Sequence, residues 1–209
     1  MSSQATTDVD PLAGRSERER AILRAAYVVM SKRGANRLNL QDIADEAGIS
    51  KGLILYHFDT KAQVLQLAMQ WALIESVQRM SAALTEAAAR GEDDPLTPLL
   101  DAIFVSPQAN RDFHLVYVDL VEHATHEEAF AGLIEVLDSI IDPVYDQVVA
   151  DGLARGRFRV DHLDHPARTM RTVIDGAFFL WLQSADWEAT HAQVKQRVHR
   201  VLTSLFVCD

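Results

Sequence analysis

A chain of 209 residues in which 48% of the side chains are hydrophobic can bury a core, as one moderate domain or as a small domain joined to a larger one. No stretch approaches the roughly 18 consecutive apolar residues of a transmembrane helix, and the polar N-terminus lacks the basic start and apolar run of a secretory signal. The single cysteine, Cys208, excludes a disulfide framework within the chain. We therefore expect a cytoplasmic protein, without a membrane partner.

The formal net charge of −10 is unevenly distributed along the chain. Residues 1–61 carry nine Lys and Arg against eight Asp and Glu, whereas residues 62–209 carry eleven against twenty-two. Only the first third could approach phosphates without strong repulsion, so a nucleic-acid site is expected there.

Nearly every segment after Gly14 repeats its apolar residues with helical period, and none alternates convincingly as a strand would. Residues 1–14 are interpreted as a disordered arm. The first helix is expected to begin at Ser16, where Glu19 completes a capping-box pattern, and to end at Gly34.

Eight further helices follow in the predicted order, and Pro143 is expected to kink the sixth of them. Their approximate ranges are 40–47, 51–58, 60–90, 99–105, 110–124, 127–154, 166–185 and 187–207. The sequence therefore predicts an all-α fold of about nine helices with essentially no sheet.

The segment from Asn39 to Phe58 is the most informative part of the chain, because it indicates two short helices joined by a tight turn. Asn39 and Ser50 are suitable N-caps, and Gly48 follows the first helix where a positive φ is expected. The residues predicted to face the core are Leu40, Ile43, Ala44, Ala47, Ile49, Ile54 and Phe58.

In a helix-turn-helix the second helix enters the DNA major groove and its N-terminal residues meet the base edges. Lys51 can donate to guanine or to phosphate, and Gly52 allows a close backbone approach. An ordinary pair of core helices does not explain the Gly-Ile-Ser turn beside the outward Tyr56 and His57 of the Tyr-His-Phe sequence. The predicted DNA-contacting residues are Asn39, Gln41, Lys51, Gly52, Leu53, Leu55, Tyr56, His57 and Lys61.

The stretch from about Arg20 to Leu65 resembles the DNA-binding domain of the TetR family of regulators. The matching elements, in the order and spacing of that family, are Asp42-Ile-Ala44, Ala47-Gly-Ile-Ser-Lys-Gly52, Tyr56-His-Phe58, Lys61 and Leu65. The resemblance implies a three-helix DNA-binding domain at residues 15–60 and a helical ligand-binding and dimerisation domain at 61–209. It also implies a repressor that a small-molecule ligand releases from a palindromic operator.

Two positions depart from the family pattern. Leu53 stands where a small polar residue is common, and Leu55 stands where an aromatic residue is common. Lys51 is then the main side chain able to read bases by hydrogen bond, so DNA shape and deformability are expected to carry much of the selectivity. The same two leucines support the alternative of a helical small-molecule-binding or protein-interaction protein without a DNA function.

The resemblance also implies a ligand pocket enclosed by the fourth to the eighth helices. A mostly apolar pocket would suit a hydrophobic or aromatic effector, although residues of this kind more often belong to the plain core. The candidate lining residues are Trp71, Ile74, Phe104, Phe113, Tyr117, Val121, Tyr145 and Phe178.

Two apolar stripes at helical spacing lie in the last two helices, and each could face either the core of one chain or a partner. The resemblance implies that these helices build a four-helix bundle across a two-fold axis, which favours a homodimer. The stripes are Val173, Ile174, Ala177, Phe178, Trp181 and Leu182, and Val194, Val198, Val201, Leu202 and Leu205.

Two histidine pairs have the three-residue spacing that a metal can use, namely His123 with His126 and His162 with His165. Both pairs fall at helix ends or in a connector among acidic residues, where solvated charge is the more common arrangement. No metal site and no cofactor are predicted. The sequence also lacks a nucleophile elbow, a phosphate loop, a dinucleotide fingerprint and a zinc-protease motif, so no enzyme is expected.

Overall fold

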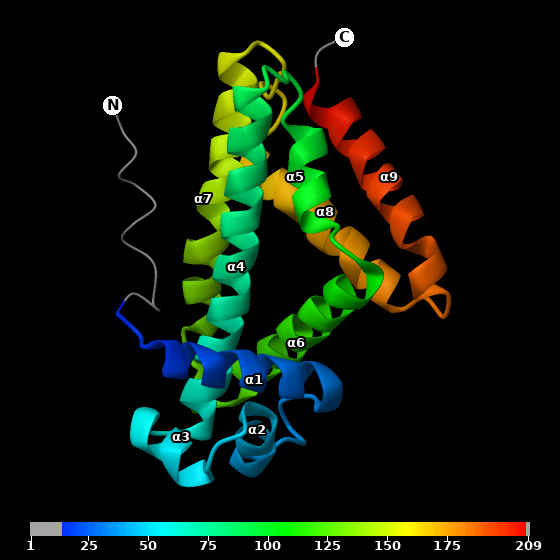
Figure 1. Ribbon diagram of the computed structural model, residues 1–209. Coiled ribbons are helices and arrows are strands. Elements are labelled where there is room, and N and C mark those ends of the chain that lie inside the picture. The colour runs from blue at the N-terminus through cyan, green and yellow to red at the C-terminus, as the bar shows by residue number, and fades with distance from the viewer. Residues whose placement is uncertain (1–13, 208–209) are drawn as a thin grey trace. The chain divides into compact units, whose positions relative to one another are not determined.

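The computed structural model describes residues 14–207, so the predicted arm up to residue 13 and Cys208 lie outside the described residues. This part of the chain forms nine α-helices and a 3-10 turn, η1, and its one strand-like pairing is an isolated bridge between Phe158 and Val207 (Figure 1). The predicted all-α fold is confirmed. The helices are α1 (Glu17–Arg33), α2 (Leu40–Ala47), α3 (Lys51–His57), α4 (Lys61–Ala89), α5 (Leu96–Ile103), α6 (Pro107–His126), α7 (Leu133–Ala154), α8 (Pro166–Leu182) and α9 (Trp187–Phe206).

Two helices begin earlier than predicted, and in each a side chain just ahead of the helix accepts hydrogen bonds from N–H groups of the first turn. The carboxylate of Asp94 accepts hydrogen bonds from the N–H groups of Leu96 at 2.9 Å and Thr97 at 3.3 Å, so α5 begins at Leu96 instead of residue 99. The hydroxyl of Ser106 accepts from the N–H of Ala109 at 3.2 Å, and α6 begins at Pro107 instead of residue 110. Proline suits the first turn of a helix because its missing N–H has no partner there.

The predicted helix at 127–154 is wrong at its start. The 3-10 turn η1 (Glu128–Phe130) and Gly132 precede α7, which begins at Leu133. Pro143 lies within α7 and does not end it. Among the described residues, no helix is long and apolar enough to cross a membrane.

The described chain divides into two compact units, and helices α4, α6 and α7 each contribute to both. The first unit comprises residues up to Glu75 together with Leu115–Ile140, and the second comprises Ser76–His114 and the residues from Ile141 onward. The functional boundary predicted near residue 60 stays a prediction.

The first unit is built on the packing of α1 against α2 and of α2 against α3. Each helix contributes fully buried aliphatic side chains: Leu23 and Ala26 from α1, Ile43 and Ala44 from α2, and Ile54 from α3. Burial of such side chains is the main force that holds short helices in place, because helices of this length are marginal alone.

In the second unit α8 packs along α9, and α9 also contacts α5. The buried faces of this pair contain Ile174, Phe178 and Trp181 from α8, and Val198 and Leu202 from α9. The unit therefore has a core of its own within one chain.

Candidate functional site

The turn between α2 and α3 has the geometry that the sequence predicts. Gly48 follows the last residue of α2 and ends the helix with a left-handed conformation, φ 65° and ψ 34°. Its N–H donates to the carbonyl of Ala44. The N–H of Ile49 also donates to Ala44 O at 3.0 Å. Ser50 then caps α3, accepting a hydrogen bond from the N–H of Leu53 at 3.3 Å.

The two faces of α3 differ sharply. Ile54 and the following Phe58 are buried, with exposed fractions of 0% and 2%, and hold the helix against the unit. On the opposite face Leu55 is 49% exposed and Tyr56 is 82% exposed. Leu55 and Tyr56 are neighbours, so α3 presents adjoining apolar side chains to solvent on the face opposite Ile54 and Phe58.

The other predicted residues of α3 lie on or beside this outer face. Lys51 and Gly52 are exposed, while Leu53 and His57 are half-buried. The structure brings all six α3 candidates onto one short helix, and their contacts with DNA stay a prediction.

Asn39 and Gln41, at the start of α2, are exposed but already engaged within the protein. The Asn39 side-chain oxygen accepts hydrogen bonds from the N–H groups of Gln41 at 2.7 Å and Asp42 at 3.2 Å. In return, the Asp42 carboxylate accepts a hydrogen bond from the Asn39 N–H at 2.8 Å. The Gln41 amide donates to Asp45 at 2.7 Å. Asn39 therefore has a structural task whether or not it meets DNA.

Lys61, the first residue of α4, is half-buried. Its ammonium nitrogen donates to the carbonyl of Ala35 at 3.0 Å. An ammonium group has three donors, so this bond leaves capacity for a phosphate.

Arg37 is a cation that the sequence analysis missed. It is exposed in the loop between α1 and α2, two residues before the Asn39 cap, and has no hydrogen-bond or ion-pair partner among residues 14–207. Its position just ahead of a capped helix in the motif was the available signal, because free guanidinium groups beside a reading helix commonly contact phosphates.

The predicted ligand-pocket residues fall in both compact units. Trp71, Ile74, Tyr117 and Val121 belong to the first, and Phe104, Phe113, Tyr145 and Phe178 belong to the second. Their role in ligand binding stays a prediction.

Within the second unit, the rings of Phe104 and Phe178 stack with centroids 4.5 Å apart. The His114 ring also stacks on Phe178, with a centroid distance of 3.9 Å. Phe113 meets His114 edge-on at 5.2 Å. Tyr145 is buried apart from this stack, and burial followed by the charge of Asp175 raises the pKa of its hydroxyl above the ordinary value.

A buried polar network around Asn110 was also missed by sequence reasoning. The Asn110 side chain donates to the carbonyl of Ile103 at 2.8 Å and accepts from His191 Nε2 at 2.8 Å, and its backbone carbonyl accepts from His114 Nδ1 at 2.8 Å. Burial lowers the pKa of His114 to about 4. Burial, with a smaller contribution from the charge of Lys195, also lowers the pKa of His191. Both rings are therefore neutral at pH 7.

Of the histidines weighed as metal ligands, His123 lies near three carboxylates, those of Asp119 and Glu122 at Nδ1 and that of Glu127 at Nε2. Asp119, Glu122 and His123 can each place one ligand atom within 4.8 Å of the others. However, Nδ1 of His123, which faces these carboxylates, lies 2.7 Å from the backbone carbonyl of Asp119 and must carry the proton to bond it. A protonated nitrogen is no metal ligand, so this group carries no metal assignment.

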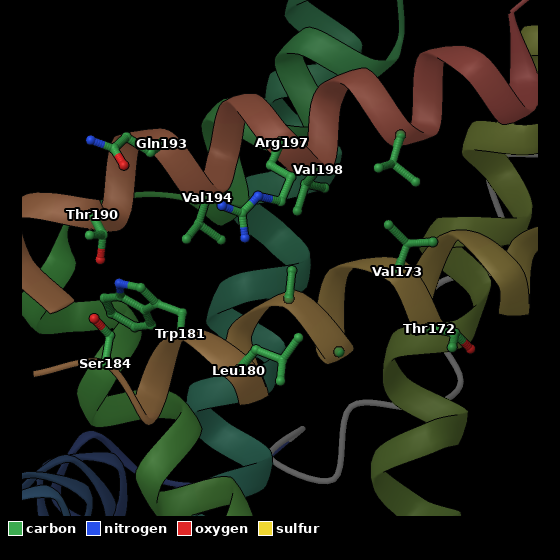
Figure 2. Close-up of a pocket in the computed structure, with 13 residues that line it drawn as sticks. Thr172, Val173, Leu180, Trp181, Ser184, Thr190, Gln193, Val194, Arg197 and Val198 are labelled. Atoms are coloured by element: carbon green, nitrogen blue, oxygen red, sulfur yellow. The ribbon is translucent and has the colours of Figure 1, made fainter. Parts of the chain in front are cut away.

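A groove of about 470 Å³ runs between α8 and α9. Figure 2 shows Leu180 and Trp181 of α8 and Val194 and Val198 of α9 lining it, and the side chain of Arg197 extends from α9 into the space between the two helices. Ile174, Phe178 and Trp181 of the first predicted stripe are buried in the core of the single chain, whereas Phe179 and Leu180 are 56% and 68% exposed. Val173, Ala177 and Trp181 of the stripe also line the groove, so the outward apolar surface of α8 combines part of the stripe with the exposed Leu180.

Comparisons with known proteins match both parts of the chain. A family model described as bacterial regulatory proteins, tetR family, matches residues 22–68, and one described as BetI-type transcriptional repressor, C-terminal, matches residues 92–207. The HTH-type transcriptional repressor KstR2 of Rhodococcus jostii (strain RHA1) is 28% identical over 154 residues, which are 73% of this chain and 73% of that protein.

Solved structures share the fold over most of their length. A TetR transcription regulator from Haloarcula marismortui ATCC 43049 aligns with a TM-score of 0.71 at 26% identity, over 91% of this chain and 98% of that chain. A protein from Saccharomonospora viridis, solved in complex with choline, aligns with a TM-score of 0.74 at 24% identity, over 93% of this chain and 100% of that chain.

Proposed function

This chain belongs to the TetR family of bacterial regulatory proteins and is a DNA-binding transcriptional repressor, and we propose that it reads its operator through the outer face of α3. The observation that carries the proposal is the contrast between the buried Ile54 and Phe58 and the outward Lys51, Leu55 and Tyr56. Insertion into a major groove requires a helix with one face buried against the protein and the opposite face exposed to solvent.

The chemistry of this face divides the contacts into two kinds. Lys51, at the N-terminal end of α3, is the proposed base-reading donor, and Leu53 and Leu55 suit thymine methyl groups. Tyr56 and the unpaired guanidinium of Arg37 are proposed phosphate contacts, which fix orientation without reading sequence. With one hydrogen-bonding reader, much of the selectivity is proposed to rest on DNA shape.

We propose further that the repressor is a homodimer that pairs through the groove of α8 and α9. The exposed Phe179 and Leu180 and the groove lined by Val194 and Val198 support this assignment, because an apolar surface of this kind is stabilised by a partner. Two copies related by a two-fold axis would present two recognition helices about 34–36 Å apart, matching successive major grooves of a palindrome.

The effector is proposed to be an apolar or aromatic small molecule. The aromatic character of Phe104, Phe113 and Phe178 supports this class. Binding would favour a separation of the two DNA-binding heads that no longer fits the operator, and so release it. Because its target is chromosomal DNA, the protein is proposed to work in the bacterial cytoplasm.

The test is selection of bound fragments from random DNA by the full chain, repeated with Lys51→Ala and at two salt concentrations. Recovery of a palindrome whose preferred bases change with Lys51→Ala is the expected result, with affinity falling as salt rises. Lys195→Ala in α9 is the charge-matched control and should recover the wild-type palindrome. A folded, dimeric wild-type protein that recovers nothing would favour the alternative of a ligand-binding helical protein without a DNA role.

A further inference from the structure

The backbone of Ala35 is hydrogen-bonded to charged side chains from two helices that lie further along the sequence. Its N–H donates to the carboxylate of Asp119 on α6, and its carbonyl accepts from the ammonium group of Lys61 on α4 at 3.0 Å. Ala35 is 0% exposed and lies in the loop between α1 and α2. Buried backbone groups require partners, and here side chains replace the missing helical ones.

Gly34 brings the Ala35 N–H to this carboxylate. Its N–H closes α1 by donating to Met30 O at 2.8 Å, and its φ of 79° turns the chain out of the helix. A Cβ atom added at Gly34 would lie 3.5 Å from the nearer carboxylate oxygen of Asp119, in a conformation that strains side-chain-bearing residues. The turn and the carboxylate are therefore closely fitted.

We propose that Asp119 and Lys61 are positioning residues for operator binding. By fixing Ala35 they set the direction in which the chain enters α2, and hence the placement of α3, which packs on α2. The other charged links between α1 and α2, Arg33 to Asp42 at 2.5 Å and Lys32 to Glu46 at 3.2 Å, join exposed cations. Pairs of that kind are worth little because solvent screens them, so the part-buried hydrogen bonds to Ala35 add a constraint that these exposed pairs do not supply, beside the apolar packing of α1 on α2.

Removing the Asp119 carboxylate has opposite expected effects on operator affinity, depending on whether Asp119 acts through its charge or by positioning Ala35. This inference rests on the proposed DNA-binding function, and a carboxylate can only repel phosphates. On charge alone, removing it leaves operator affinity unchanged or raises it. If Asp119 acts by position, removing it weakens binding. Lys61 is less informative because it is also a predicted phosphate contact.

The experiment measures operator affinity, its salt dependence and the preferred half-site spacing for the full chain on the palindrome that the wild type selects. D119A is expected to weaken binding at least about tenfold with an unchanged salt slope and to broaden the spacing preference. D119N, whose amide oxygen can accept the same N–H, should stay within about threefold of the wild type. E122A, which removes a carboxylate three residues further along α6, should bind as tightly as the wild type or more tightly.

A D119A protein that binds as tightly as the wild type with the same spacing preference overturns the inference. If D119A does not fold, Asp119→Ser withdraws the acceptor with a shorter polar side chain and is judged by the same outcomes. Hydrogen exchange of the Ala35 amide, measured in the free protein, tests the positioning role of Asp119 separately from the DNA-binding function. The exchange rate should rise in D119A whether or not the protein binds DNA. If the Ala35 amide still exchanges slowly in D119A, Asp119 does not hold the Ala35 backbone. A wild-type protein that selects no palindrome contradicts the DNA-binding proposal instead.

Discussion

Single residues of the DNA-binding motif can carry two tasks at once, and Asn39 is the clearest case. The sequence predicts it both as a helix cap and as a DNA contact, and in the free protein its side-chain oxygen caps α2 at the N–H groups of Gln41 and Asp42. A substitution that keeps the cap but changes the outward chemistry can therefore separate the two tasks.

We predict that Asn39→Ala lowers the free energy of unfolding by about 1 kcal/mol, because two N–H groups at the start of α2 lose their acceptor. Urea unfolding of the full chain measures this loss. Asn39→Ser retains a capping oxygen and should unfold close to the wild type. If Asn39 also contacts DNA, the serine variant will bind the operator more weakly despite its normal stability. An alanine variant as stable as the wild type would contradict the capping role.

The spacing of residues within the motif is what made its faces predictable from sequence. Ile54 and Phe58 are four residues apart, so they share one side of a helix, and both are buried. The polar network of Asn110 and His191 could not be predicted in this way, because its members are 81 residues apart and meet only when α6 and α9 pack. Local periodicity indicates which face is buried and carries no information about the partner.

At the scale of elements, that network joins three helices of the second unit. Asn110 and His114 lie on α6, His191 lies on α9, and the carbonyl of Ile103 ends α5. Both histidines are neutral in the folded protein because burial lowers their pKa values. The packing of these helices therefore depends on pH.

We predict that the second unit loses stability as the pH falls from 6.5 towards 4. The unfolded histidines take up protons near pH 6.5, whereas folded His114 resists protonation down to about 4, so acid favours the unfolded chain. The stabilisation is complete above pH 6.5 and declines by up to about 1.4 kcal/mol per pH unit for each such group. Thermal melts between pH 7.5 and 4.5 measure it.

The matched variant for this pH dependence is His114→Phe. A phenyl ring preserves the stack on Phe178, where the centroid distance is 3.9 Å, and has no proton to bind. This variant should lose less stability on acidification than the wild type, and His126→Gln, at the exposed end of α6, should match the wild type. An identical pH profile for wild type and His114→Phe would show that other groups cause the acid sensitivity.

Element boundaries show where sequence patterns stop being sufficient. The helical periodicity of α7 extends N-terminally into residues that form η1, and the extended ψ of Ala131 and the positive φ of Gly132 separate the two. Likewise, α8 carries apolar residues on more than one side, so its stripe could face the core or a partner. Ile174 and Phe178 are buried within one chain, while Val173 and Ala177 of the same stripe line the outward groove together with Leu180.

At the scale of the whole molecule, the charge distribution restricts how this acidic protein can meet DNA. Its net charge is −10, but residues 1–61 are nearly balanced. With Lys51 as the one proposed hydrogen-bonding reader, a single recognition helix would bind weakly, and two heads held in the proposed dimer would raise the affinity for a palindrome. The apolar groove between α8 and α9 is where the proposed function places that pairing.

We predict that Leu180→Glu converts the protein to a monomer and weakens binding to the full palindrome by at least about a hundredfold, because the two half-sites are no longer bound together. Leu180 is 68% exposed within one chain, so the substitution costs the monomer little and acts on the pairing. Sedimentation velocity and operator titration measure the two effects. Leu153→Glu is the matched control, since Leu153 is a 45% exposed leucine of α7 outside the groove, and it should stay dimeric with wild-type affinity. A Leu180→Glu protein that remains a dimer would mean that copies of this chain pair through another surface, and the spacing of its half-sites would then report the geometry of that surface.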